Sequence, residues 1–184
     1  MKKRLDVTID PKCIMSKIAC ALFFISAFLR IWHYGAQEND TFTRWVQLIM
    51  PVSAAVVFLL GMSLGGNAAK PAVTAATVIG VAFFIIKATT FEPLHQALCT
   101  VLYTAVLVLF TATLWGLLPT KILLYPLFGL PLLYHIFVED TKLYFFAEPP
   151  VPVWYWMPEI SVLCIMAGLL CLSIGLDTKK LRLS

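Results

Sequence analysis

Charged and imidazole side chains gather near one end of several apolar segments of this chain. Arg30 and Lys87 are the clearest examples, since each lies inside an apolar stretch, a turn or two before it ends. In hydrocarbon, an ionisable group costs about 2.5 to 3.5 kcal/mol at the bilayer centre, so it is expected to reach the interface, to pair, or to line a watered cavity. The candidate ligand-binding residues are Arg30, His33, Lys87, Glu92, His95, His135 and Glu159.

These residues favour one kind of chemistry, the binding of a small solute. Two cations in partly desolvated surroundings suit an anionic or zwitterionic molecule, because ion pairing strengthens as water is excluded. The alternative is that Glu92 and Glu159 neutralise the two cations and hold helices together. Glu159 follows Pro158, and a carboxylate in the first turn of a helix is also stabilised by the helix dipole.

Metal binding and catalysis have less support. His95 and Cys99 are four residues apart on one helix face, a spacing that suits two metal ligands or a Cys/His pair. No further ligand is specified, and the sequence contains neither Gly-x-Ser-x-Gly nor His-Glu-x2-His. We therefore expect no metal and no other cofactor, and we expect the chain not to be an enzyme. An intramembrane Cys/His enzyme is kept as the third reading.

The composition indicates a membrane protein. The chain has 184 residues, of which 60% are hydrophobic and only 13% charged, about half the charged share of a soluble domain. Its mean hydropathy is +0.87. The Lys and Arg residues form no long basic block, which argues against a nucleic-acid partner. The five cysteines lie in or beside apolar segments, so a secreted disulfide framework is not expected.

Six apolar segments are long enough to cross a bilayer, which requires about 20 residues. The sequence therefore predicts an all-α fold, a bundle of six transmembrane helices forming one domain over residues 1–184. The first helix is expected to start near Pro11, and Pro126 and Pro131 are expected to kink the fifth. The predicted spans are 14–34, 45–64, 71–88, 94–118, 122–138 and 154–176.

An even number of spans places both termini on one side of the membrane, and the positive-inside rule predicts that this side is cytoplasmic. The predicted inner side then carries ten basic residues and the outer side four. The inner residues are Lys2, Lys3, Arg4, Lys12, Lys17, Lys70, Lys121, Lys179, Lys180 and Arg182. The outer residues are Arg30, Arg44, Lys87 and Lys142.

Small residues predict close packing of the second and third spans. Gly61-x3-Gly65 and Ala72-x3-Ala76-x3-Gly80 each place small side chains on one helix face, so the two backbones are expected to form a tight hairpin. Such faces can instead join two chains. The longer outer loop, residues 139–153, is rich in proline and aromatic residues and is expected to lie on the membrane surface or to cover the bundle as a lid.

In size, number of spans and an outward-facing polar end, the chain resembles the substrate-binding S components of energy-coupling-factor vitamin transporters. The resemblance covers the general plan and no motif. Those proteins present an Ala-x3-Ala face on their first span, where this chain has Ser16-x3-Cys20. No residue role is transferred from that family.

The sequence thus predicts an integral membrane protein that binds or transports a small anionic or zwitterionic solute from the outer face. The alternative is a non-catalytic assembly or regulatory subunit. The expected partners are the lipid bilayer, the solute, and either a membrane subunit or further copies of the chain, with no nucleic acid. The expected location is the plasma or inner membrane, crossed several times.

Overall fold

The structure is a computed structural model that describes residues 5–35, 37, 40–90, 94–118, 128, 129, 133 and 157–180. It is mostly helical. The helices are α1 (Ile14–Gly35), α2 (Thr41–Arg44), the π-helical turn η1 (Trp45–Ile49), α3 (Met50–Leu64), α4 (Gly66–Thr90), α5 (Leu94–Leu114) and α7 (Met157–Gly175). Two short strands, β1 (Leu5–Thr8) and β2 (Asp177–Lys180), lie near the ends of the chain.

In the described ranges, four helices are long and apolar enough to cross a membrane. They are Ile14–Gly35, Thr41–Leu64, Ala68–Thr90 and Met157–Gly175. These helices make the chain a multi-pass membrane protein, and they cover the first, second, third and sixth predicted spans. The fourth predicted span falls on α5, whose apolar part is Thr100–Leu114. Most of the fifth, 122–138, lies outside the described residues.

Local capping explains where two helices begin. Asp10 accepts hydrogen bonds from the backbone N–H of Lys12 and of Cys13, so the chain makes a turn there and α1 begins at Ile14. The predicted start near Pro11 was therefore too early. The second span begins earlier than predicted, at Thr41, because Asp40 caps the helix by accepting a bond of 2.9 Å from the Thr43 N–H.

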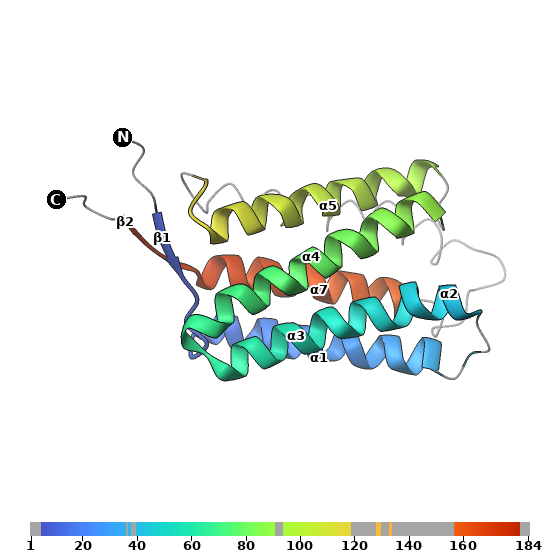
Figure 1. The fold of residues 1–184 in the computed structure, drawn as a ribbon, viewed down its shortest axis with the longest axis horizontal. Helices are drawn as coiled ribbons and strands as arrows, with labels where there is room; N and C mark the ends of the chain where they lie inside the picture. The colour runs from blue at the N-terminus through green and yellow to red at the C-terminus, as the bar shows by residue number, and fades with distance from the viewer. Residues whose placement is uncertain are drawn as a thin grey trace.

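The first and last helices of the chain are neighbours in the bundle. α1 packs extensively against α7, α3 against α4, and α4 against α5 (Figure 1). β1 and β2 pair as an antiparallel ribbon in which Leu5 lies opposite Lys180. The two strands therefore lie at the same end of the bundle, the end at which α1 begins and α7 finishes (Figure 1).

The predicted close approach of the second and third spans is confirmed. Gly61 of α3 lies directly against Ala72 of α4, and a Cβ added at Gly61 would overlap the Ala72 methyl group. The reversal between the two helices is made at Gly65, whose φ of 64° is in the left-handed region that glycine adopts without strain. These small residues join α3 and α4 into a hairpin within one chain.

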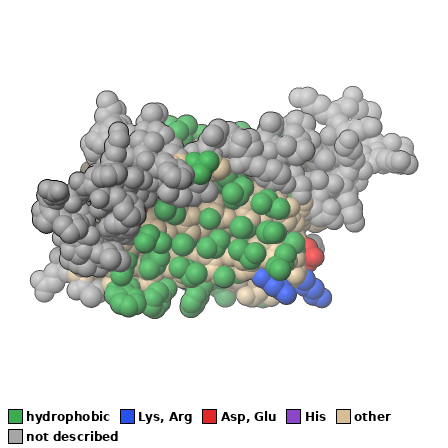
Figure 2. All heavy atoms as spheres, turned by 180° about the vertical axis from the view of Figure 1, so that it is seen from behind, with side chains coloured by type: hydrophobic (Ala, Val, Ile, Leu, Met, Phe, Trp, Pro, Cys, Tyr) green, Lys and Arg blue, Asp and Glu red, His purple; other side chains and the backbone are tan. Residues whose placement is uncertain are grey.

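The outer surface of the bundle is apolar. Large side chains such as Phe24, Leu60, Val78 and Val108 are 45% or more exposed and come from four different helices. Figure 2 shows the described part of one face covered by hydrophobic side chains, with charged side chains confined to one end. Lipid tails suit such a surface, whereas water does not.

Candidate functional site

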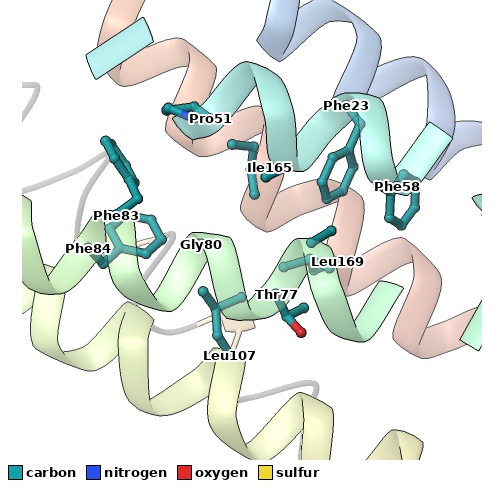
Figure 3. A pocket seen from close by; sticks show the side chains of 12 residues that line it. Phe23, Pro51, Phe58, Thr77, Gly80, Phe83, Phe84, Leu107, Ile165 and Leu169 are labelled. Atoms are coloured by element: carbon teal, nitrogen blue, oxygen red, sulfur yellow. The ribbon is translucent and has the colours of Figure 1, made fainter. Parts of the chain in front are cut away.

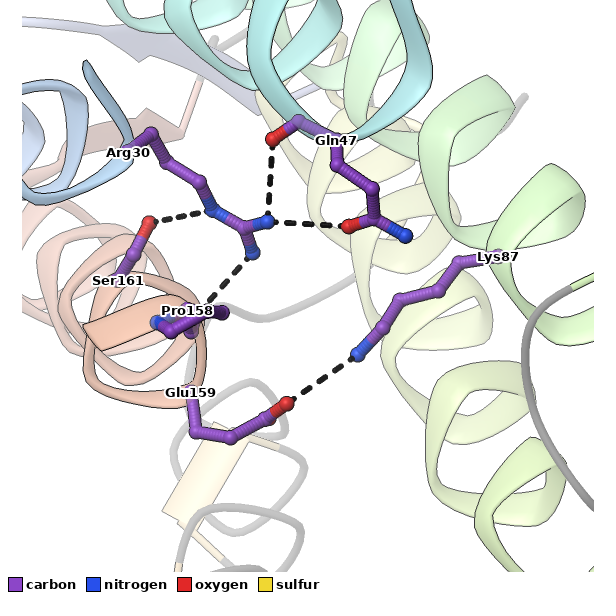
Figure 4. A network of polar contacts seen from close by, with 6 residues as sticks. All are labelled: Arg30, Gln47, Lys87, Pro158, Glu159 and Ser161. Carbon is purple, nitrogen blue, oxygen red and sulfur yellow. Dashed lines mark hydrogen bonds and ion pairs between the residues drawn. The ribbon is translucent and has the colours of Figure 1, made fainter. Parts of the chain in front are cut away.

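Arg30 is the central residue of the site. It lies on α1, its side chain is only 1% exposed, and it hydrogen-bonds three residues on two other elements, η1 and α7 (Figure 4). Its Nε donates to Ser161 Oγ at 2.9 Å, and its Nη2 donates to the Pro158 carbonyl at 3.1 Å. Its Nη1 donates to both oxygens of Gln47, the backbone carbonyl at 3.2 Å and the side-chain Oε1 at 3.1 Å. Arg30 therefore holds η1 and the start of α7 against α1.

The sequence explains why the Gln47 carbonyl is available. In an α-helix this carbonyl would accept from the N–H four residues on, but that residue is Pro51, which has no N–H. The π-helical turn lies at the same place and ends at Ile49, two residues before Pro51. The Gln47 carbonyl, which cannot accept the α-helical bond from residue 51, accepts one from the buried guanidinium.

A pair of serines completes the contact between α1 and α7. The hydroxyl oxygens of Ser26 and Ser161 are 2.8 Å apart, and Ser161 also donates to the Ser26 carbonyl at 3.2 Å. Both residues are buried, with exposed fractions of 1% and 0%. Ser161 can accept the Arg30 bond because its own proton is directed to Ser26.

The hydrogen-bond acceptors of Arg30 are all neutral, and the Glu159 carboxylate acts on its charge without a direct contact. Within the part of the chain that the structure describes, no carboxylate forms an ion pair with it. The faces of two rings lie near the guanidinium carbon, with the Phe83 centroid at 5.3 Å and the Tyr34 centroid at 5.7 Å. The guanidinium is well bonded, yet its positive charge is not cancelled by direct contact with an anion.

A second cation lies beside it. Lys87 Nζ on α4 is 3.8 Å from Glu159 Oε1 in the first turn of α7, with the two side chains 13% and 24% exposed. Figure 4 shows this ion pair across from the Arg30 guanidinium. Arg30 and Lys87 lie near the ends of α1 and α4, and Glu159 lies at the start of α7. These helix ends are at the end of the bundle opposite β1 and β2 (Figure 1).

The other predicted site residues have different outcomes. His33 lies one turn after Arg30, where its ring contacts Tyr34 edge-on at 4.6 Å and its Nε2 is 3.4 Å from Gln37 Nε2. His95 lies on α5, but its side chain is not among those described. Glu92 and His135 lie outside the described residues, as does the predicted lid, residues 139–153. The ligand role of all seven residues stays a prediction.

Three polar residues around Arg30, namely Ser26, Gln47 and Ser161, were not among the predicted site residues, although the sequence contained a signal for each of them. Ser26 is four residues before Arg30 and hence on the same helix face. Gln47 is a polar residue within an apolar segment, four residues before a proline, and Ser161 is another polar residue inside an apolar segment. Polar side chains at such depth usually contact one another, and this rule would have grouped them with Arg30.

A small cavity lies in the centre of the bundle (Figure 3). Its volume is about 20 Å³, and residues of α1, α3, α4, α5 and α7 line it. Two of these residues connect it to the charged cluster. Phe83 faces the Arg30 guanidinium, and Pro51 is the residue that leaves the Gln47 carbonyl to Arg30. The cationic site therefore borders an apolar interior space.

Among the described residues, no three His, Cys, Asp or Glu side chains lie close enough together to hold a metal ion. Cys99, the second member of the predicted Cys/His pair, has no described side chain. No protein family, curated protein or solved structure matches this chain.

Proposed function

We propose that this protein binds a small anionic or zwitterionic solute at the outer end of a six-helix transmembrane bundle, as a receptor or a transporter. Arg30 and Lys87 supply the positive charge, and Glu159 is the internal partner that a ligand competes with. The observation that carries the proposal is the buried Arg30 guanidinium, whose hydrogen-bond acceptors are all neutral and which is in direct contact with no carboxylate of the described residues.

Physical chemistry favours an anion at such a place. A buried positive charge attracts an anion more strongly than a charge in water does, because the surrounding medium screens it less. Glu159 shows that a carboxylate can be accommodated next to Lys87. A ligand carboxylate that enters between Arg30 and Lys87 would interact with both positive charges. Both cations are already in place, so binding would not require another cation to be buried.

In the proposed topology, six helices cross the plasma or inner membrane and both termini lie in the cytoplasm. The ten basic residues of the predicted inner side against four on the outer side support this orientation. The pairing of β1 with β2 at one end of the bundle is consistent with an even number of spans. The Arg30 cluster then faces the outside, where a solute would be captured.

The proposal can be tested by measuring the affinity of the purified protein for small anions by calorimetry. A suitable set is acetate, benzoate, glutamate and phosphate. We expect at least one to bind, and Lys87→Gln to weaken that binding by about tenfold or more, the loss of one charge-assisted contact. Arg44→Gln removes an exposed charge on α2 and is the matched control, with no expected effect. If none of these anions binds, the proposal fails.

A second function, an assembly or regulatory subunit without a ligand of its own, is favoured by a different observation. The four hydrogen bonds of Arg30 join α1 to η1 and to α7, so the guanidinium also serves as a link between helices. This reading predicts that substitutions of Lys87 lower the amount of protein in the membrane and change no affinity for any anion. Quantification of membrane abundance beside the calorimetry separates the two functions.

A further inference from the structure

We infer that the solute is a singly charged carboxylate with a short apolar body, whose carboxylate meets Arg30 and Lys87 and whose apolar end enters the cavity beside Phe83. This inference rests on the proposed function and adds the chemical class of the ligand. It is carried by the contact between the charged residues and the cavity, because the Phe83 ring lies over the Arg30 guanidinium and also lines the cavity.

The number of unused donors on Arg30 limits the head group. A guanidinium has five N–H groups, and the hydrogen bonds to Ser161, Gln47 and Pro158 use four of them. The second N–H of Nη2 has no hydrogen-bond partner in the part of the chain that is described, and Figure 4 shows Nη2 on the side of Glu159 and Lys87. One remaining donor suits one carboxylate oxygen, whereas a phosphate would leave several oxygens without a donor from Arg30.

The walls of the cavity exclude a polar body. They are hydrocarbon and aromatic apart from Thr77, and Phe23 and Phe58 stack at a centroid distance of 3.9 Å along one side. The Thr77 hydroxyl already donates to the Thr74 carbonyl at 2.8 Å and lies 3.0 Å from Thr111 Oγ1. A sugar hydroxyl or a peptide group placed here would find no hydrogen bond and would lose its hydration.

The size of the cavity limits the apolar body to a few carbons. A volume of about 20 Å³ is little more than that needed for one water-sized group, and an apolar space of this kind stays dry. A methyl or ethyl terminus would fill it without displacing a helix. A long acyl chain would have to separate α3 from α4, which are in close contact at Gly61 and Ala72.

The test is a series of carboxylates measured on the unmodified protein by calorimetry: acetate, propionate, butyrate, hexanoate and octanoate, with butyramide as the uncharged analogue. We expect the affinity to rise about fourfold for each added methylene, the value for apolar transfer, and to stop rising after the first few. Butyramide is expected not to bind. A steady rise up to octanoate would indicate a lipid-derived fatty acid and would overturn the short body.

A cavity-filling variant tests the contribution of the cavity to binding independently of the contribution of Arg30 and Lys87. Ala76→Leu places a larger side chain on the cavity wall, and Ala54→Val is a milder change on the facing helix. We expect either variant to remove the dependence on chain length while acetate binds with unchanged affinity. Val78→Leu, at a position 59% exposed on the outer surface, is the matched control and should retain the dependence.

The outcomes distinguish this inference from the proposed function. If acetate, butyrate and hexanoate bind equally well, the anion site stands and the apolar body is wrong. If butyramide binds as tightly as butyrate, the charged cluster has no part in recognition and the inference is overturned. If no carboxylate in the series binds but another anion does, only the ligand class is wrong.

Discussion

Arg30 Nε donates a hydrogen bond of 2.9 Å to Ser161 Oγ, and this contact joins the first helix of the chain to the last. The two residues are separated by 131 positions in the sequence and are both buried. The same guanidinium also reaches Gln47 and Pro158, so a single side chain fixes the relative positions of α1, η1 and α7.

Replacement of Arg30 should therefore destabilise the bundle. Arg30→Met removes four hydrogen bonds and leaves their acceptors buried, and at about 0.6 kcal/mol for each bond within a membrane we expect a loss of roughly 2 kcal/mol. Reversible unfolding in mixed micelles measures this difference.

Two variants serve as comparisons for Arg30→Met. Arg44→Gln removes an exposed charge and should leave the free energy of unfolding unchanged. Arg30→Lys keeps the charge but cannot reproduce the planar fork, so its stability should lie between the other two. If Arg30→Met is as stable as the unmodified protein, the guanidinium is not the link described above.

The contact between Gly61 and Ala72 predicts a rescue experiment. Gly61→Ala adds a methyl group where the Ala72 methyl group already lies, so we expect a loss of about 1 to 3 kcal/mol in unfolding free energy, typical of overpacking. Adding Ala72→Gly should restore most of it, because the double variant only moves the methyl group across the interface. Gly35→Ala is the control and should be nearly neutral, because among the described residues its added carbon would meet only Ile31, at 3.8 Å.

Glu159→Gln should strengthen anion binding. The change keeps the size of the side chain but removes the carboxylate that competes with a ligand for Lys87. For a partly exposed ion pair worth up to about 1 kcal/mol, the gain in affinity should be up to about fivefold. Titration of the variant with the best-bound anion measures it. Weaker binding by Glu159→Gln would show that the carboxylate assists the ligand.

The cap at Asp40 predicts a local pH dependence. The Thr43 hydroxyl, and after it the Thr43 N–H, hydrogen-bond the Asp40 carboxylate and lower its pKa below the ordinary 3.8. Because the pKa is lower in the folded state, the cap stabilises α2 at pH values above 3.8 and is lost as the pH falls through the lowered value.

Hydrogen exchange of the Thr43 amide, corrected for its intrinsic rate, measures this effect. Protection should decrease in acid for the unmodified protein. Asp40→Asn keeps an acceptor at the cap without a titrating group, so its protection should not vary over the same range. An equal decrease in both proteins would contradict the assignment.

The sequence predicted the helices well where composition alone decides them. Length and hydropathy place α1, α3, α4 and α7, because a bilayer requires long apolar segments. Small residues predicted the approach of α3 to α4. The beginnings of helices were less accurate, since the Asp10 turn and the Asp40 cap depend on single side chains that hydropathy does not register.

The candidate site was predicted in part. Arg30, Lys87 and Glu159 could be grouped because each is predicted to lie near the outer end of its span, and charged residues at the same membrane depth in neighbouring helices can approach one another. The order of packing could not be predicted, because nothing in the sequence indicates that α1 lies against α7. Without that neighbour, Ser161 could not be assigned to Arg30, and the guanidinium had no expected acceptor except a carboxylate.

The distance along the chain between Arg30 and Ser161 has a consequence for biogenesis. At 5 to 20 residues per second, Ser161 is synthesised roughly 7 to 26 seconds after Arg30, so the nascent first helix enters the lipid before its acceptors on α7 exist. During that interval only the two Gln47 oxygens are available to the guanidinium, and we expect the insertion machinery, or an assembly factor, to supply the other contacts. Truncated nascent chains that end before α7 should therefore remain attached to the translocon, and release should follow only when the last helix has emerged.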